Sequence, residues 1–252
     1  MNHIPKVIKH LIVVNVIMFL ATRINPGRMY DLFAMHFPFS PLFRWWQVLT
    51  HMFMHGGIMH ILFNMYALWA FGTPLIYHLG RKRFLWFYFL SGLGALALFT
   101  GVEYYHFHQY LKAIEQSGVP AKLVMEILRS PDPESAIQSM PSLLYNQTFL
   151  TYIAKIFQIY NSPMLGASGA IYGVLVGFAF FYPRAKLMLI FLPYPLEARY
   201  FIPLLILLDI FFGFTNVLHL PIAHFAHVGG ALTGLILMWI WRNKQDDYYF
   251  IS

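Results

Sequence analysis

Six long apolar runs dominate the sequence, each bounded by charged or turn-forming residues. A bilayer core about 30 Å thick needs roughly 20 mostly apolar residues in a spanning helix, and each run comes near that length. Only 11% of the residues are Asp, Glu, Lys or Arg, against about 25% in soluble domains. We therefore predict an all-α polytopic membrane protein with a single membrane domain over residues 1–252. The expected spans are Ile4–Thr22, Gly57–Leu79, Phe84–Val102, Leu165–Tyr182, Tyr200–Leu218 and Pro221–Trp241.

Lys and Arg are divided unevenly between the two sides that six spans create. The side with both termini carries ten cations in short segments against three acids, whereas the other carries seven cations in long loops against six acids. Short loops rich in Lys and Arg stay in the cytoplasm, so both termini are predicted to be cytoplasmic. The same topology accounts for the net charge of +7 without a nucleic-acid partner, because the cations do not gather on one face.

Two long loops lie on the predicted external side. Residues 23–56 contain a Phe-Arg-Trp-Trp cluster at 43–46, which is typical of an anchor at the membrane interface. Residues 103–163 are too polar to span, and helical periodicity on both sides of a Pro-Asp-Pro breaker predicts two or three short helices. On the cytoplasmic side, Leu187–Leu196 contains two prolines and is expected to form a surface hairpin.

A Gly-Ala-Ser-Gly motif opens the fourth span and places Ser168 at the start of the helix. Polar groups inside spans cost free energy, so each is a functional candidate. A hydroxyl at a helix N-terminus can attack a carbonyl while free backbone N–H groups stabilise the oxyanion. Gly169 and Gly173 form a small-residue stripe suited to close helix packing. Taken alone, the motif fits a structural role better, with Ser168 as N-cap and the glycines as packing surfaces.

Two further groups lie near the external ends of their spans. His227 opens the last span together with a second glycine stripe, Gly230 and Gly234. If the two stripes meet, its imidazole comes within reach of the hydroxyl, although a lone histidine in a span is as often structural. His60 and Asn64 are four residues apart on one face of the second span, and both can donate a hydrogen bond to an oxyanion.

Other polar residues of these segments are interpreted as structural. His51 and His55 precede the second span and are expected to bond to the loop backbone. Asp209 lies about a third of the way along the fifth span from its external end, and we interpret it as a buried structural carboxylate or hydrogen-bond partner. The chain has no Cys, which excludes disulfides and thiolate chemistry. We expect no metal and no cofactor.

In this order and on six spans, the three groups resemble the rhomboid intramembrane serine proteases. The matching segments are Gly166-Ala167-Ser168-Gly169, Ala226-His227-Val228-Gly229-Gly230, and the pair His60 and Asn64. The resemblance implies that Ser168 is the nucleophile and His227 the general base, in a dyad without a third carboxylate. It also implies that Tyr172 stacks on His227, and that the oxyanion hole comprises His60, Asn64 and the Ser168 N–H.

The resemblance further implies a substrate and a route to the site. Single-span membrane proteins within the lipid bilayer would be cleaved near the external face through an acyl-enzyme. Residues 23–56 would be a membrane-embedded loop, and Phe63 with residues 202–212 would form a lateral gate. This chain departs from the family pattern in two places. It reads Trp46-Gln47 where family members often have Trp-Arg, which puts a polar contact of that loop in doubt, and its 103–163 segment is unusually long.

Two rival functions remain open. One is an inactive rhomboid-like protein that binds membrane helices, although such proteins typically lose the Ser or the His. The other is a metal or ion transporter built on the 12 histidines, of which His224 and His227 are three residues apart. Short termini without a targeting peptide favour a bacterial cytoplasmic membrane. The oligomeric state is not predicted.

Overall fold

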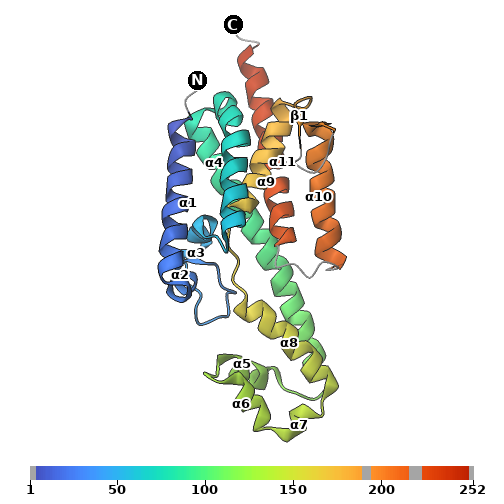
Figure 1. Cartoon of the computed structure of the whole chain (residues 1–252). Coiled ribbons are helices and arrows are strands. Elements are labelled where there is room, and N and C mark those ends of the chain that lie inside the picture. Colours follow the sequence, from blue (N-terminus) through green and yellow to red (C-terminus); the bar gives the residue numbers. More distant parts are fainter. Residues whose placement is uncertain (1–3, 189–193, 216–222, 250–252) are drawn as a thin grey trace.

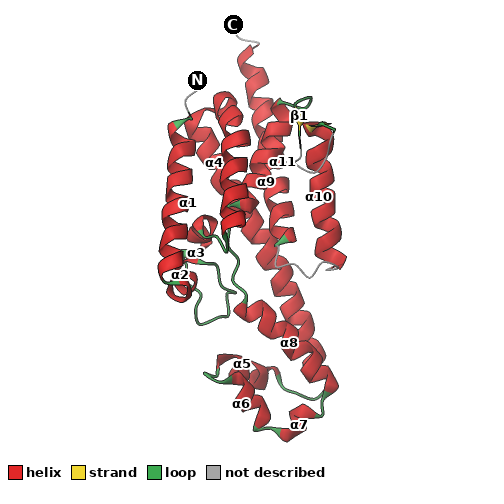
Figure 2. Ribbon diagram, in the orientation of Figure 1, coloured by secondary structure: helices red, strands yellow, loops and turns green. Residues whose placement is uncertain are grey.

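Helices make up most of the chain in this computed structural model, which describes residues 4–188, 194–215 and 223–249. The long helices run side by side as a bundle, and a group of short helices extends beyond one end of it (Figure 1). The start of the first helix and the end of the last helix lie together at the opposite end. Within the described residues, strand structure is limited to one small hairpin near that opposite end (Figure 2).

Four helices of the described part are long and apolar enough to cross a membrane. These are α1 (Lys6–Ile24), α4 (Ile58–Gln116), α10 (Ala198–Thr215) and α11 (His224–Tyr249), the last being apolar as far as Trp241. A shorter apolar helix, α9 (Ser168–Phe181), lies among them. The chain is therefore a helical membrane protein, as the apolar runs predicted.

Helix α4 contains two of the predicted spans, joined by a kink at Gly80. This residue has φ 71° and ψ 167°, a conformation that glycine adopts without steric cost. One helix ends at this kink and the next begins directly after it. The second helix runs on to Gln116, so the predicted span that ends at Val102 is continuous with the helix expected over residues 104–116. No Gly or Pro interrupts the chain between Val102 and Gln116, and one charged residue, Glu103, does not end a helix.

The helices beyond the bundle form a unit that shares a hydrophobic core with the last part of α4, which contributes Phe107 and Ile114. They are α5 (Ala121–Arg129), α6 (Pro133–Gln138), α7 (Pro141–Leu144) and α8 (Gln147–Asn161). This is more than the two or three short helices expected. Asp132 accepts a hydrogen bond from the Ser135 N–H at 3.1 Å, so the Pro-Asp-Pro segment separates two helices and also caps the second of them. Buried Val124, Phe149 and Ile156 form the centre of this unit.

The segment 23–56 folds around a buried glutamine. It contains α2 (Pro26–Phe33), α3 (Gln47–Thr50) and the single 3₁₀ turn η1 (His51–Phe53). The Gln47 amide accepts hydrogen bonds from the His36 and Arg44 N–H groups at 3.3 and 3.0 Å. It donates to the Asp31 and Leu42 carbonyls, both at 2.9 Å. Gln47 therefore supplies the polar contact that the missing arginine had put in doubt.

Two further predictions concern segments of which only part is described. Strands β1 (Lys186–Leu187) and β2 (Leu196–Glu197) pair in antiparallel register, as expected for a hairpin over this stretch. Residues 189–193 of the predicted hairpin lie outside the described residues. The predicted end of the fifth span and start of the sixth, at residues 216–222, also lie outside them.

Helices α4, α9 and α11 pack against one another and form the centre of the bundle. The two glycine stripes face each other there. A side chain at Gly230 would overlap the backbone of Gly169, and a side chain at Gly234 would lie 2.7 Å from the Gly173 Cα. The backbones of α9 and α11 are thus in direct contact, which brings the first turns of both helices together.

Candidate active site

Ser168 is the first residue of α9, and the segment before it is held tightly. Gly166 has φ +123°, which disfavours any residue with a side chain, and its N–H donates to the His51 carbonyl at 2.9 Å. A Cβ at Gly166 would lie 2.9 Å from His60 Nε2 and 3.6 Å from Ser168 Oγ. The absence of this Cβ leaves both groups facing one small space.

The His227 imidazole lies beside the Ser168 hydroxyl. His227 belongs to the first turn of α11, and its Nε2 is 3.0 Å from Ser168 Oγ. This distance is within the range required of a nucleophile and its general base. The glycine contact between α9 and α11 explains it, because helices separated by larger side chains would hold the two groups further apart.

A carboxylate lies on the other side of the same ring. Asp209 of α10 is buried, and its Oδ1 is 3.1 Å from His227 Nδ1 and 2.6 Å from His224 Nδ1. A carboxylate oxygen only accepts hydrogen bonds, so each Nδ1 carries a hydrogen. His227 Nε2 is then the unprotonated nitrogen and can accept the Ser168 proton.

The contact between Asp209 and His227 was not predicted. The sequence indicated a structural carboxylate or hydrogen-bond partner, kept apart from a Ser-His dyad, and the structure makes it a partner of His227 itself. The position of Asp209 along its own span did not indicate which residues of the next helix lie at the same level. Asp209 lies six residues before the end of α10 at Thr215, and His227 lies in the first turn of α11, so the two reach similar levels. Asp209 is also the single acidic residue in the predicted spans, a signal that was available in the sequence.

Tyr172 covers one face of the His227 ring. The ring centroids are 4.2 Å apart and the planes differ by 10°, so the two rings stack. Tyr172 lies one helical turn after Ser168 on α9, which directs both side chains toward α11. The stacked phenol restricts rotation of the imidazole about its Cβ bond.

His60 and Asn64 both belong to the first turns of α4. Asn64 is buried, and its Nδ2 has no hydrogen-bond partner among the described residues. A buried donor without a partner costs free energy, so it marks a place where an acceptor fits. His60 Nε2 faces the space at Gly166 that Ser168 Oγ also faces. The His60 ring and the free N–H groups at the start of α9 are thus available near the hydroxyl, and Asn64 offers an unpartnered donor one helical turn after His60.

The two histidines before α4 differ from each other. His51 Nδ1 donates to the Gln47 carbonyl at 2.9 Å, as expected for a structural residue. Both ring nitrogens of His55 are buried without a hydrogen-bond partner in the described ranges, so the bond to the loop backbone that the sequence predicted for His55 is wrong. Burial lowers the pKa of His51 to about 4. Burial, together with the neighbouring His60, also lowers the pKa of His55 to about 4. Both rings are therefore neutral at pH 7.

The cluster around Asp209 is also the one group of described residues with the composition and spacing of a metal site. One ligand atom each from Asp209, His224 and His227 lies within 4.8 Å of the others. The hydrogen bonds of 2.6 and 3.1 Å within the cluster already satisfy both imidazole Nδ1 groups. Asp209 Oδ2, by contrast, is buried and has no hydrogen-bond partner among the described residues.

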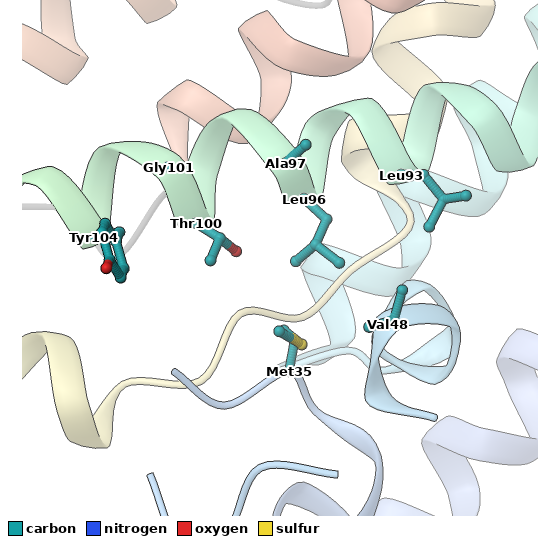
Figure 3. A pocket seen from close by; sticks show the side chains of 8 residues that line it. All are labelled: Met35, Val48, Leu93, Leu96, Ala97, Thr100, Gly101 and Tyr104. Carbon is teal, nitrogen blue, oxygen red and sulfur yellow. The ribbon is translucent and has the colours of Figure 1, made fainter. Parts of the chain in front are cut away.

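An apolar pocket lies apart from these groups, between segment 23–56 and the second half of α4. Figure 3 shows Met35 and Val48 facing Leu96 and Thr100 of α4. None of the predicted site residues lines it. The chemistry-bearing side chains are instead gathered where α4, α9, α10 and α11 meet.

A comparison with protein families shows to which family the chain belongs. The model of the rhomboid domain matches residues 42–111 and 140–244. The chain belongs to the rhomboid family. The matched segments of this rhomboid chain include Ser168, His227, His60 and Asn64, whereas α5 and α6 fall in the unmatched gap.

Individual rhomboid proteins are similar over different parts of the chain. An uncharacterised mitochondrial rhomboid protein of Schizosaccharomyces pombe is 27% identical over 213 residues, which is 80% of this chain and 53% of that protein. The mitochondrial presenilin-associated rhomboid-like protein of Homo sapiens is 24% identical over 207 residues, 79% of this chain and 40% of that protein. Rhomboid protease GluP of Bacillus subtilis is 41% identical over 61 residues, 24% of this chain and 12% of that protein. The chain thus spans about half the length of these relatives, or less.

Proposed function

We propose that this rhomboid chain is an intramembrane serine endopeptidase in which Ser168 is the nucleophile and His227 the general base. The observation that carries the proposal is the 3.0 Å contact between Ser168 Oγ and His227 Nε2 at the meeting of two helix N-termini. An ordinary structural serine at a helix start bonds to the backbone of its own helix. The N-cap position of α9 is occupied by Ala167, and the Ser168 hydroxyl contacts His227 instead.

The reaction would proceed through an acyl-enzyme. His227 Nε2 takes the Ser168 proton as Oγ bonds to the carbonyl carbon of the scissile peptide, and it then gives this proton to the leaving amine. A water molecule, activated by the same nitrogen, hydrolyses the ester. His60, Asn64 and the Ser168 N–H would hold the oxyanion, a role supported by the unpartnered Asn64 Nδ2. The stacking of Tyr172 on His227 supports its proposed role in orienting the base.

We infer six membrane spans from these helices, with both termini in the cytoplasm. The kink at Gly80 divides α4 into two apolar helices, and α1, α9, α10 and α11 supply the other four. Ser168 and the segment 23–56 would then lie toward the external face, together with the unit α5–α8. Water reaches a site near this face more readily than the bilayer centre, and hydrolysis needs water.

The substrate we propose is the transmembrane helix of a single-span membrane protein. Phe63 of α4 and Phe211 of α10 are each 55% exposed, and both offer apolar surface on which such a helix could lie while it enters the site. The substrate helix must unwind locally because its hydrogen bonds shield each peptide bond. Small or helix-breaking residues near its external end lower this cost.

The membrane in which the protein works stays a prediction. The sequence favoured the bacterial cytoplasmic membrane, but the comparisons do not support this choice. Relatives that align over about four fifths of the chain are mitochondrial, and a bacterial relative aligns over 61 residues.

The experiment that tests the proposal is cleavage of a panel of single-span proteins by purified enzyme in liposomes. We expect wild type to cleave at least one of them near its external end, and Ser168→Ala and His227→Ala to cleave none. Thermal unfolding and gel filtration of both variants provide the folding control. Cleavage by Ser168→Ala at the wild-type rate would contradict the proposal. A folded wild type that cleaves no substrate and binds helices would instead support the inactive rhomboid-like binder.

A further inference from the structure

Asp209 is a buried carboxylate that the proposed Ser-His chemistry does not use. Its side chain is 8% exposed, and a single oxygen, Oδ1, meets both the His224 and the His227 imidazole. An ionised group inside a membrane protein is costly unless its partners compensate. Two N–H donors on Oδ1 provide part of that compensation, whereas Oδ2 is buried without a partner among the described residues. One of the two donors is the proposed general base.

We propose that Asp209 is a positioning residue for His227, with His224 holding the carboxylate in place. This inference rests on the proposed function and goes beyond the Ser-His dyad. The carboxylate fixes the hydrogen on Nδ1 and directs Nε2 toward Ser168 Oγ, as the distances of 3.1 and 3.0 Å require. Tyr172 restrains the same ring from its face. The base is therefore held by contacts from α9 and α10.

The proton balance needs no further reactant. As Ser168 Oγ bonds to the carbonyl carbon, its proton passes to His227 Nε2 and the ring becomes a cation. The Nδ1 hydrogen stays on the ring, where Asp209 accepts its hydrogen bond and its negative charge stabilises the cation. When the peptide C–N bond breaks, the Nε2 proton passes to the leaving amine. Asp209 is ionised throughout.

Four side chains decide the charge around the His227 ring. Asp209 is contributed by α10, His224 by α11, Tyr172 by α9 and His60 by α4. Asp209 is the single carboxylate in this group, and the shorter bond of 2.6 Å goes to His224 rather than to His227. His224 thus anchors the carboxylate, and the same Oδ1 atom also accepts the hydrogen bond from His227.

A simpler role for Asp209 is to attach α10 to α11. The hydrogen bonds to His224 and His227 join the two helices whatever the chemistry. This role and the positioning role predict different kinetics. Loss of a helix contact lowers the folded fraction or changes KM, whereas loss of a positioning charge lowers kcat and changes its dependence on pH.

The test compares kcat, KM and the pH profile of wild type and Asp209→Asn for one cleaved single-span substrate. We expect kcat to fall about 100-fold, which is the size of effect for a small misplacement of a catalytic group, with little change in KM. The acidic limb of the profile should move to lower pH, because a neutral amide stabilises the imidazole cation less than a carboxylate does. Asp31→Asn, the same change at an exposed residue of α2, should behave as wild type.

His224 has a variant of its own in the same assay. His224→Asn keeps an N–H donor near the carboxylate and should lower kcat less than Asp209→Asn does. If Asp209→Asn does not fold, Asp209→Glu decides the question. It keeps the charge but moves it by one methylene, so we expect a lowered kcat with the acidic limb unmoved. A wild-type kcat and pH profile in a folded Asp209 variant would overturn the positioning role.

Two controls separate this inference from its alternatives. Cleavage should be unchanged by EDTA, and activation by Zn²⁺ alone would assign the Asp209, His224 and His227 cluster to a metal and overturn the inference. Ser168→Ala reports on the proposed function itself. Loss of cleavage in Ser168→Ala with full activity in Asp209→Asn would refute the positioning role alone. Equal cleavage by wild type and Ser168→Ala would refute both.

Discussion

The bundle centre and the unit α5–α8 are packed in opposite ways. Helices α9 and α11 touch through glycine backbones, where a methyl group at Gly230 would overlap Gly169. Helices α5–α8 pack through large side chains, among which Val124, Phe149 and Ile156 are almost entirely buried. Backbone contact lets two helices approach more closely than the usual 8–10 Å between helix axes.

The two kinds of packing serve different purposes: one fixes the distance between two side chains, and the other stabilises the folded state. A distance of 3.0 Å between Ser168 and His227 needs helices whose spacing has no freedom to vary, and glycine contact provides such spacing. The α5–α8 unit needs to bury apolar surface, and each large side chain contributes about 1.5–3 kcal/mol when buried. Substitutions in the first region should therefore act on the chemistry, and those in the second on folding.

The largest effect is expected from a single methyl group at the helix contact. Gly230→Ala should lower cleavage about 100-fold or more, because α11 must move away from α9 and carry His227 with it. Gly101→Ala is the matched control, since a Cβ there meets no atom within 4 Å. Cleavage assays and thermal unfolding of both variants check this prediction. An unchanged cleavage rate in Gly230→Ala would show that the contact between α9 and α11 does not determine the distance between Ser168 and His227.

A large substitution in α8 should affect folding and leave the chemistry intact. Phe149→Ala is expected to destabilise the α5–α8 unit by about 3–5 kcal/mol, since this ring is fully buried. Hydrogen exchange should increase in α5–α8, while reaction of Ser168 with a fluorophosphonate continues. Tyr145→Ala, at a ring that is 85% exposed, should change neither. Loss of Ser168 labelling in Phe149→Ala would mean that the two regions are coupled.

Mild acid should destabilise segment 47–56, which contains His51 and His55, before it destabilises the α5–α8 unit. Burial holds the pKa of His51 and His55 at about 4, below the usual 6.5. Below pH 6.5 the unfolded chain therefore binds more protons than the folded chain does. The free energy of unfolding is highest above pH 6.5 as far as these two rings are concerned, and it decreases as the pH falls toward 4. Residues 121–161 contain no histidine.

Hydrogen exchange at pH 7 and pH 5 checks this order. We expect protection to fall first in segment 47–56, with a smaller loss in His55→Gln because one titrating ring is gone. Equal acid sensitivity of the α5–α8 unit would contradict the account.

Much of the bundle could be predicted from the sequence because the bilayer imposes simple rules. Apolar runs near 20 residues long indicated the helices, and small-residue spacing indicated which faces meet. Glycine stripes also suggested that Ser168 and His227 come together, and the structure brings them to 3.0 Å. These signals are local, so they can be read along the chain.

Contacts between helices that depend on rotation could not be predicted in the same way. Asp209 meets His227 because α10 turns that face inward, and span boundaries alone do not give this rotation. The continuity of α4 across Val102 was missed for another reason. Polarity marks where a helix leaves the membrane, whereas helix ends depend on Gly, Pro and caps such as the Gly118 that follows.

Labelling with a fluorophosphonate probe shows directly whether the Ser168 hydroxyl is an activated nucleophile. The probe reacts with a serine hydroxyl only when a base and an oxyanion site activate it. We expect wild-type protein in liposomes to be labelled at Ser168, with labelling lost in Ser168→Ala and His227→Ala while both variants stay folded. A folded wild type that is not labelled, or equal labelling of Ser168→Ala, would contradict the assignment of Ser168 and His227 as nucleophile and base.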